Sequence, residues 1–149
     1  MKPILLTVLC LLCAALTQAS CTEEHEQREN DMDTIVLTAG NHRLTATLAD
    51  NSSARALKEE LSKGNITVRM EDYAHMEKVG PLGRNLPRND RQTTTAAGDL
   101  ILYQGNQFVI YYSPNSWSFT RLGKIDGATR EELLEVLGEG DVTVTLSLK

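Results

Sequence analysis

The stretch "GDLILYQGNQFVIYYS", residues 98–113, decides the fold of this chain. Two apolar runs flank Gly105-Asn106, a dipeptide typical of a tight turn between antiparallel strands. A two-residue turn predicts three directly opposed pairs: Tyr103 with Phe108, Leu102 with Val109, and Ile101 with Ile110. Opposed residues share a face, so both faces of this hairpin are apolar. We therefore expect both to be covered, as when a barrel interior lies on one face and a helix packs on the other.

The residues before this hairpin predict two strands, a helix and a third strand. "TIVLTAGNHRLTATL" (34–48) has alternating runs around a second Gly-Asn turn, with Leu44, Ala46 and Leu48 on one face. Residues 51–63 change to helical periodicity, with Ser52 or Ser53 as the cap and Gly64 at the end. Residues 65–70 alternate again and point three side chains inward: Ile66, Val68 and Met70.

The residues after the hairpin complete a mainly β pattern. Residues 118–125 predict a strand, and Thr129 with Glu132 forms a capping box that opens a short helix. Residues 141–148 alternate as a last strand. Six of the seven aromatic residues lie between Tyr103 and Phe119, so this region is expected to anchor the core. Many short strands, tight turns and two short α-helices predict a closed β-barrel.

The connection between these halves, residues 73–97, is long for a compact domain. Residues 91–99 are small and polar, and we expect them to add nothing to the core. Long connections are often functional or mobile, so this segment is expected to be the least ordered part of the domain and a place for a ligand.

The start of the chain has the pattern of an export signal. In residues 1–21, Lys2 precedes a short apolar run and small residues follow it. Cys21 stands where bacterial lipoproteins carry their lipidated cysteine, which predicts a membrane-anchored lipoprotein of the cell envelope. Gln18 departs from the usual aliphatic residue, so cleavage by an ordinary signal peptidase, giving a soluble periplasmic or secreted protein, stays open.

Charge and cysteine content narrow the function further. Residues 22–33 hold six acids and one arginine, and we interpret them as a disordered tether. Residues 34–149, with 14 acids and 13 basic residues, lack the basic excess of a nucleic-acid-binding domain. No cysteine follows Cys21, so the domain is expected to be stable without disulfides, as a monomer that meets the membrane only through its anchor.

The order of motifs resembles the small bacterial cyclophilin-like domain family, a compact β-barrel related in fold to the prolyl isomerases. The matching pieces are "TATLADNSSARAL", "MEDYAHMEKVGPL", Leu86-Pro87, "GDLILYQGNQFVIYY" and "TRLGKIDG". True cyclophilins use an arginine in a Phe-His-Arg context, and this chain has no such run. Arg121, two places after Phe119, is the only near substitute. The resemblance therefore implies the fold and transfers no catalytic residue.

The sequence gives only weak indications of a metal site or of a ligand site. Asp72, His75 and Glu77 could ligate a metal, but the plainer interpretation is a polar loop, and we expect no metal or cofactor. The basic residues of the loop suit either solvent or an anionic ligand. Aromatic side chains beside them could line a groove. The candidate ligand-binding residues are Tyr73, Arg84, Arg88, Tyr111, Tyr112, Trp117 and Arg121.

These patterns favour a non-enzymatic module of the cell envelope that binds a peptide or a small molecule. A peptidyl-prolyl isomerase is the alternative, on the resemblance alone. An inert structural barrel is the third interpretation, which a domain without a cavity beside Tyr111 or Tyr112 would favour.

Overall fold

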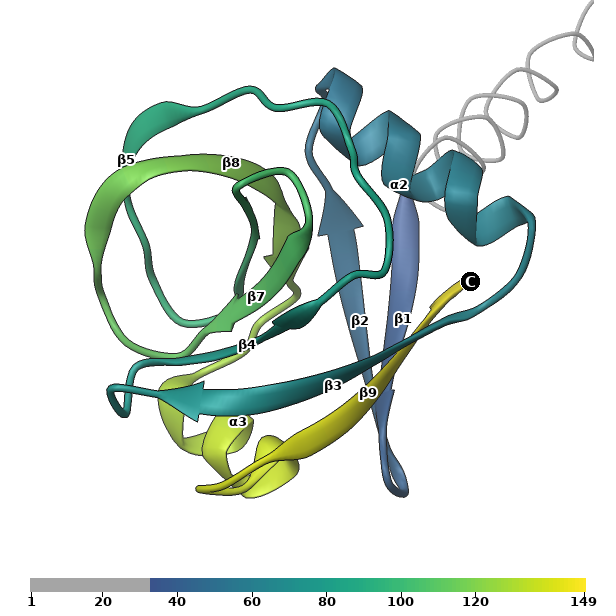
Figure 1. Cartoon of the computed structure of the whole chain (residues 1–149). Helices are drawn as coiled ribbons and strands as arrows, with labels where there is room; N and C mark the ends of the chain where they lie inside the picture. Colours follow the sequence, from purple (N-terminus) through teal and green to yellow (C-terminus); the bar gives the residue numbers. More distant parts are fainter. Residues whose placement is uncertain (1–32) are drawn as a thin grey trace, which may run out of the picture.

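Eight antiparallel strands close into a barrel in the computed structural model, which describes residues 33–149 (Figure 1). Their order around the barrel is β2-β1-β9-β3-β4-β7-β6-β8, and β8 pairs back onto β2. The predicted mainly β barrel with two helices is thus confirmed. The signal at 1–21, Cys21 and nearly all of the tether at 22–33 lie outside the described residues. The strands are β1 (Thr34–Ala39), β2 (His42–Leu48), β3 (Ile66–Tyr73), β4 (Glu77–Pro81), β6 (Asp99–Tyr103), β7 (Gln107–Tyr111), β8 (Ser116–Ile125) and β9 (Val142–Leu148).

The barrel closes where β2 meets the second half of β8, with Ala46 opposite Ile125 and Leu48 opposite Gly123. A Cβ atom on Gly123 would lie 2.4 Å from the carbonyl oxygen of Thr47. The close approach of the two strands therefore requires glycine at this position.

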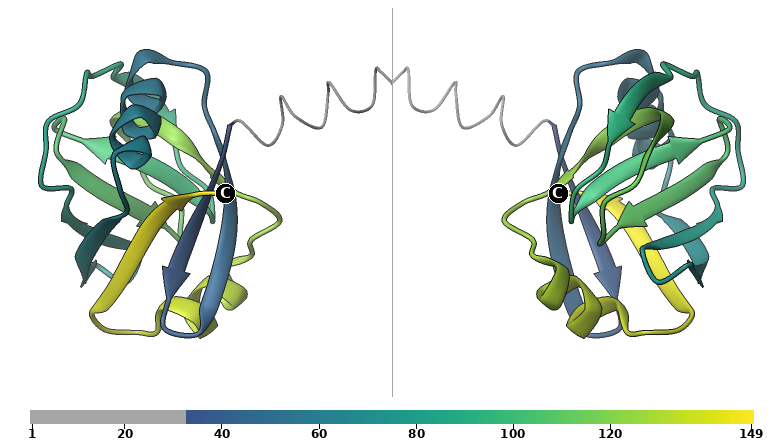
Figure 2. Two further views of the ribbon diagram at one scale, coloured as in Figure 1. Left: turned by 90° about the vertical axis from the view of Figure 1, so that its right-hand side faces the viewer. Right: turned by 90° about the vertical axis from the view of Figure 1, so that its left-hand side faces the viewer.

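Helices α2 (Ser52–Ser62) and α3 (Arg130–Leu137) cover opposite ends of the barrel (Figures 1 and 2). Each helix contributes leucines to the main core: Leu57 and Leu61 from α2, and Leu133 and Leu137 from α3. The capping box of Thr129 and Glu132 is confirmed. Among the described residues, no helix has the length and apolar character needed to cross a membrane.

The predicted cap of α2 is wrong, because Asn51 takes that role. The Asn51 side chain accepts a hydrogen bond of 2.9 Å from the Ala54 amide. Ser53 is fully buried, and its hydroxyl instead donates to the Pro87 carbonyl at 2.5 Å. The serine thus ties the helix to the segment that crosses over it.

The hairpin and strand patterns predicted for the first half are confirmed. Ala39 pairs with His42 across the two-residue Gly40-Asn41 turn, where the φ of Gly40 is +55°. The three side chains expected to point inward from β3 are buried: Ile66, Val68 and Met70.

The register predicted for the central hairpin is wrong by one residue. Its turn has three residues, because Gln104 and Gly105 both adopt positive φ, +52° and +79°. The observed pairs are Leu100 with Ile110, Ile101 with Val109, Leu102 with Phe108, and Tyr103 with Gln107.

Both faces of this hairpin are nevertheless apolar and buried. Leu100, Leu102 and Ile110 belong to the main core inside the barrel, whereas Ile101 and Val109 belong to a second cluster outside it. The outer face is covered by a strand, and not by a helix as in the example above. That face packs against Phe119, from the first half of β8.

The segment 73–97 is not a loose loop. It contains β4, an integral strand of the barrel, and β5 (Arg91–Thr94), which pairs with the first half of β8. The link between these strands places Leu82 and Leu86 in the main core. Thr95 and Asp99 are also buried, so the expectation that residues 91–99 add nothing to the interior is wrong.

Candidate functional site

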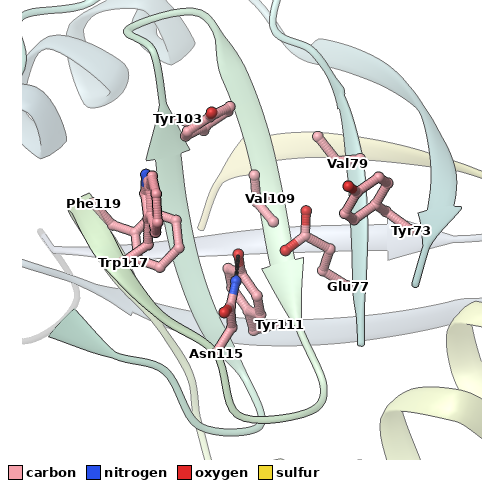
Figure 3. Close-up of a pocket in the computed structure, with 9 residues that line it drawn as sticks. All are labelled: Tyr73, Glu77, Val79, Tyr103, Val109, Tyr111, Asn115, Trp117 and Phe119. Carbon is pink, nitrogen blue, oxygen red and sulfur yellow. Dashed lines mark hydrogen bonds between the residues drawn. The ribbon is translucent and has the colours of Figure 1, made fainter. Parts of the chain in front are cut away.

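A pocket of about 350 Å³ opens on the outer face of the barrel, on the strands β3, β4, β7 and β6 (Figure 3). Strand pairing sets its floor. Glu77 of β4 lies between Tyr73 of β3 and Tyr111 of β7, each directly opposite it in the sheet. In the next outward-facing row, Val79 lies opposite Val109.

The wall of the pocket comes from β8, which belongs to two pairings. Its residues 120–124 pair with β6 in the barrel, but residues 116–119 leave β6 and pair with β5. Alternation along this first half turns Trp117 and Phe119 toward the pocket. The lining residues are Tyr73, Glu77, Val79, Tyr103, Val109, Tyr111, Asn115, Trp117 and Phe119.

Ring contacts hold the aromatic wall in shape. The ring centroid of Phe119 lies 5.6 Å from that of Tyr111 and 6.4 Å from that of Tyr103. The second contact is close to the edge-to-face arrangement that aromatic pairs favour. Asn115 donates a hydrogen bond of 3.2 Å to the Tyr111 hydroxyl. By contrast, Trp117 and Tyr73 at the rim are 60% and 59% exposed.

The single acidic residue of this lining, Glu77, is 8% exposed. Burial raises the pKa of its carboxyl, a hydrogen bond with Tyr111 lowers it, and the charge of Asp72 raises it again; the net pKa is above the ordinary value. Burial and the hydrogen bond to Glu77 likewise raise the pKa of the Tyr111 hydroxyl. The site thus places a largely buried carboxyl group among aromatic side chains. This combination suits a ligand with a polar or charged end.

A second polar group lies on the opposite side of β4, inside the barrel. Lys78 is fully buried and donates to the Asp72 carboxylate at 2.9 Å and to the Gly140 carbonyl at 2.7 Å. The Tyr112 hydroxyl donates to the same Asp72 oxygen at 2.5 Å. Lys78, expected as part of a solvated basic loop, is therefore a satisfied interior residue.

Three of the seven candidate residues meet at the pocket: Tyr73, Tyr111 and Trp117. The other four side chains lie apart from it. Arg84 pairs with Glu60 of α2 at 2.8 Å, and Arg88 pairs with Asp90. Arg121 pairs with Asp99 at 2.8 Å, and Tyr112 faces the barrel interior, opposite to Tyr111, as alternation predicts.

Sequence reasoning weighed Glu77 only as a metal ligand and did not propose Tyr103, Asn115 or Phe119 for the site. The hint for Glu77 was its position two residues before Val79, which puts both on one face if β4 is recognised as a strand. His75 contacts Asp72 at 3.4 Å on the turn before β4. Within residues 33–149, no three His, Cys, Asp or Glu side chains are grouped closely enough to hold a metal ion.

Fold and site together define a small helix-capped β-barrel domain with a pocket of about 350 Å³ on its outer wall. The chain belongs to the cyclophilin-like family, whose sequence model matches residues 37–147.

Known structures agree on the fold. The solution structure of a hypothetical protein from Archaeoglobus fulgidus matches with a TM-score of 0.56, over 78% of this chain and 94% of that protein, at 8% sequence identity. At this identity the likeness shows the fold alone. No curated protein matches the sequence.

Proposed function

We propose that this domain is a binding module that holds a peptide segment or a small molecule in the aromatic pocket. The observation that carries the proposal is the exposure of Trp117 and Tyr73, 60% and 59%, at the rim of a pocket whose floor contains the buried Glu77. Large aromatic side chains are normally covered in a monomer, and exposed ones beside a cavity are typical of a binding site.

The size and chemistry of the pocket support a ligand of modest size. Its volume of about 350 Å³ lies at the lower end of the range of small-molecule sites, roughly 300–1,000 Å³. An apolar, aromatic lining with a few polar groups, here Glu77 and Asn115, is the usual composition of such sites. A single side chain of a peptide, or a small organic molecule, would fill it.

Binding is favoured over catalysis because the lining residues do not form an acid–base pair. Glu77 and the tyrosine hydroxyls are their only titratable groups, and the pKa of Tyr111 is raised. The alternative of a prolyl isomerase would place a guanidinium beside the bound proline. Arg121 is outside the pocket lining and is paired with the fully buried Asp99.

Trp117 provides a direct test, since it is the only tryptophan of the chain. Its fluorescence should change saturably when a pocket ligand binds, and a panel of short peptides and small metabolites should contain such ligands. Trp117→Leu should weaken binding when this is followed by calorimetry. The exposed strand residue Thr94→Val serves as the control, because it lies on β5 and does not line the pocket.

A panel in which no compound binds saturably would contradict the proposal. Proline-containing peptides form a separate arm. Uncatalysed cis–trans exchange takes about tens to hundreds of seconds at 25 °C. If these peptides bind and their exchange is no faster than this, the domain binds them without isomerase activity.

We also propose that the module is exported and anchored to the cell envelope through a lipid on Cys21, as in bacterial lipoproteins. The support is the pattern of residues 1–21, with an acidic stretch at 22–33 to separate the barrel from the membrane. Mass spectrometry of the mature N-terminus distinguishes a diacylated Cys21 from a free N-terminus left by an ordinary signal peptidase. The second result would replace the anchored form by a soluble periplasmic or secreted one.

A further inference from the structure

The aromatic pocket has a charge of one sign. Glu77 is the only charged residue that lines it, and the residue is 8% exposed. None of the influences on its protonation comes from a neighbouring cation of residues 33–149. A buried carboxylate normally pairs with a cation, so this one has an unused capacity for a positive partner.

Two nearby cations are paired elsewhere, while the exposed Arg91, opposite Phe119 on β5, and Arg69 of β3 lie outside the lining. Lys78, the next residue in β4, points to the opposite face of the strand and binds Asp72 and Gly140. Arg121, which stands opposite Ile101 on the outer face, pairs with Asp99. Within residues 33–149, no cation acts on the Glu77 carboxyl, so burial keeps its pKa raised, and a cationic ligand in the pocket would lower that pKa.

The rings around Glu77 favour the same partner. The negative faces of Trp, Tyr and Phe rings attract organic cations, and Trp is the strongest of the three. Tyr73 and Tyr111 flank the carboxylate within the sheet, while Trp117 and Phe119 supply the facing wall (Figure 3). Tyr103 of β6 lies against Phe119. Several rings together with a carboxylate form the kind of cage that recognises alkylammonium groups.

We infer that the ligand presents an alkylammonium group to Glu77, with its carbon atoms against the aromatic wall. This inference rests on the proposed binding function and names the class of its ligand. The same chemistry occurs in a free quaternary amine and in a methylated lysine of a peptide, so the two sources are tested separately.

The decisive comparison uses choline and 3,3-dimethylbutan-1-ol, its neutral isostere, which has the same shape without the charge. Titration followed by Trp117 fluorescence and calorimetry should show choline binding about tenfold more tightly or better. Nα-acetyl-trimethyllysine amide is the peptide-like arm. Tighter binding of this compound than of choline would identify a lysine side chain as the source, and the reverse would identify a free amine.

Two matched variants locate the effect. Glu77→Gln should reduce the preference for choline by about threefold or more, leaving the part that the rings supply, while the neutral isostere still binds, which also shows that the pocket remains folded. Glu71→Gln removes an exposed carboxylate from the outer face of β3, beside Val79 but outside the lining, and should leave the preference intact.

Equal affinities of wild-type protein for choline and its isostere would overturn the inference and leave the binding function standing. An undiminished preference in Glu77→Gln would also overturn it. If no ammonium compound binds while neutral or anionic compounds do, the inference fails alone; if nothing in either panel binds, both proposals fail.

Discussion

Lys78 Nζ lies 2.9 Å from Asp72 Oδ1 inside the barrel, while the neighbouring Glu77 faces outward into the pocket. Two adjacent residues of one strand thus carry opposite charges to opposite faces. The inner charge is paired and hydrogen-bonded, and the outer one has no cationic partner in the described domain. Strand β4 therefore combines an element of stability with an element of the proposed binding site in five residues.

Removing the cation of the inner pair should destabilise the barrel. Lys78→Met fills a similar volume but leaves the Asp72 carboxylate without its ion pair, and we expect a loss of about 3–5 kcal/mol in the free energy of unfolding. The double variant Lys78→Met with Asp72→Asn should recover a large part of this loss, because no unpaired charge remains. Urea denaturation measures both. Lys63→Met, which removes a half-exposed lysine from its surface pair with Glu60, is the control.

A Lys78→Met variant as stable as the wild type would show that the pair adds nothing. A double variant no more stable than the single one would show that volume, and not charge, determines the loss.

The two carboxyls should give the stability of the domain opposite pH dependences. Burial raises the pKa of Asp72, but hydrogen bonds from Lys78 and Tyr112 outweigh burial and hold it below 3.8. Its contribution is thus present above pH 3.8 and is lost as the pH falls through the lowered pKa. The pKa of Glu77 is raised above 4.5, so its contribution is present below pH 4.5 and is lost as the pH rises through the raised pKa.

The Glu77→Gln variant isolates the second effect. The amide cannot ionise, so the variant should gain stability relative to the wild type as the pH rises from 4.5 toward neutrality. Unfolding free energies measured from pH 3 to pH 8 test this, with Glu71→Gln as the control for an exposed acid. If the wild-type and Glu77→Gln curves run parallel over this range, Glu77 is not destabilised by its burial.

Much of this fold follows from local sequence patterns. Alternation in β1–β3, the Gly40-Asn41 turn and the Thr129–Glu132 capping box each involve neighbours along the chain, and all were predictable. The predicted register of the central hairpin was wrong because Gln104, a residue type that is uncommon in turns, adopts a positive φ. A turn one residue longer exchanges every opposed pair while leaving both faces apolar.

The site was less accessible to such reasoning. β4 has one branched apolar residue, Val79, and its buried Lys78 is stabilised by Asp72 and Gly140, so no local pattern marks a strand. The bend that takes β8 from β6 to β5 brings Phe119 and Trp117 over the hairpin, and this depends on tertiary pairing. The clustering of the aromatic residues in the sequence was enough to propose some of them for the site. The sequence could not show that the candidate arginines would instead pair with Glu60, Asp90 and Asp99.

Gly80 should be irreplaceable for steric reasons. A Cβ atom there would lie 2.1 Å from the Arg69 carbonyl oxygen and 2.9 Å from a methyl carbon of Val68, so β3 and β4 would have to separate. We expect Gly80→Ala to lower the free energy of unfolding by about 2–3 kcal/mol. Gly140→Ala is the matched control, since a Cβ atom at Gly140 would meet nothing within 4 Å and the φ of this residue is not positive. Equal melting temperatures of the two variants would contradict this steric requirement.

Thr120 should hold the segment 82–90 against the barrel. Its buried hydroxyl accepts a hydrogen bond of 2.8 Å from the Asn89 amide and donates one of 2.6 Å to Asp90. Thr120→Val keeps the shape of the side chain but removes the hydroxyl, so the Asn89 amide and the Asp90 carboxylate each lose a hydrogen bond. We expect this to lower the free energy of unfolding by about 1–3 kcal/mol. Exchange of the Asn89 amide proton with solvent should then accelerate.

The same variant should change the titration of Asp90. The hydrogen bond from Thr120 is the main reason that the pKa of Asp90 lies below 3.8, with Arg88 as the second, so Thr120→Val should raise this pKa toward 3.8. NMR titration of the side-chain carboxyl measures the change. Thr94→Val, whose hydroxyl meets only the exposed Ser116 hydroxyl at 2.7 Å, should leave both amide exchange and the Asp90 titration unaltered. An unchanged Asp90 pKa in Thr120→Val would mean that Arg88 alone sets it, and that the segment is held by its leucines in the core.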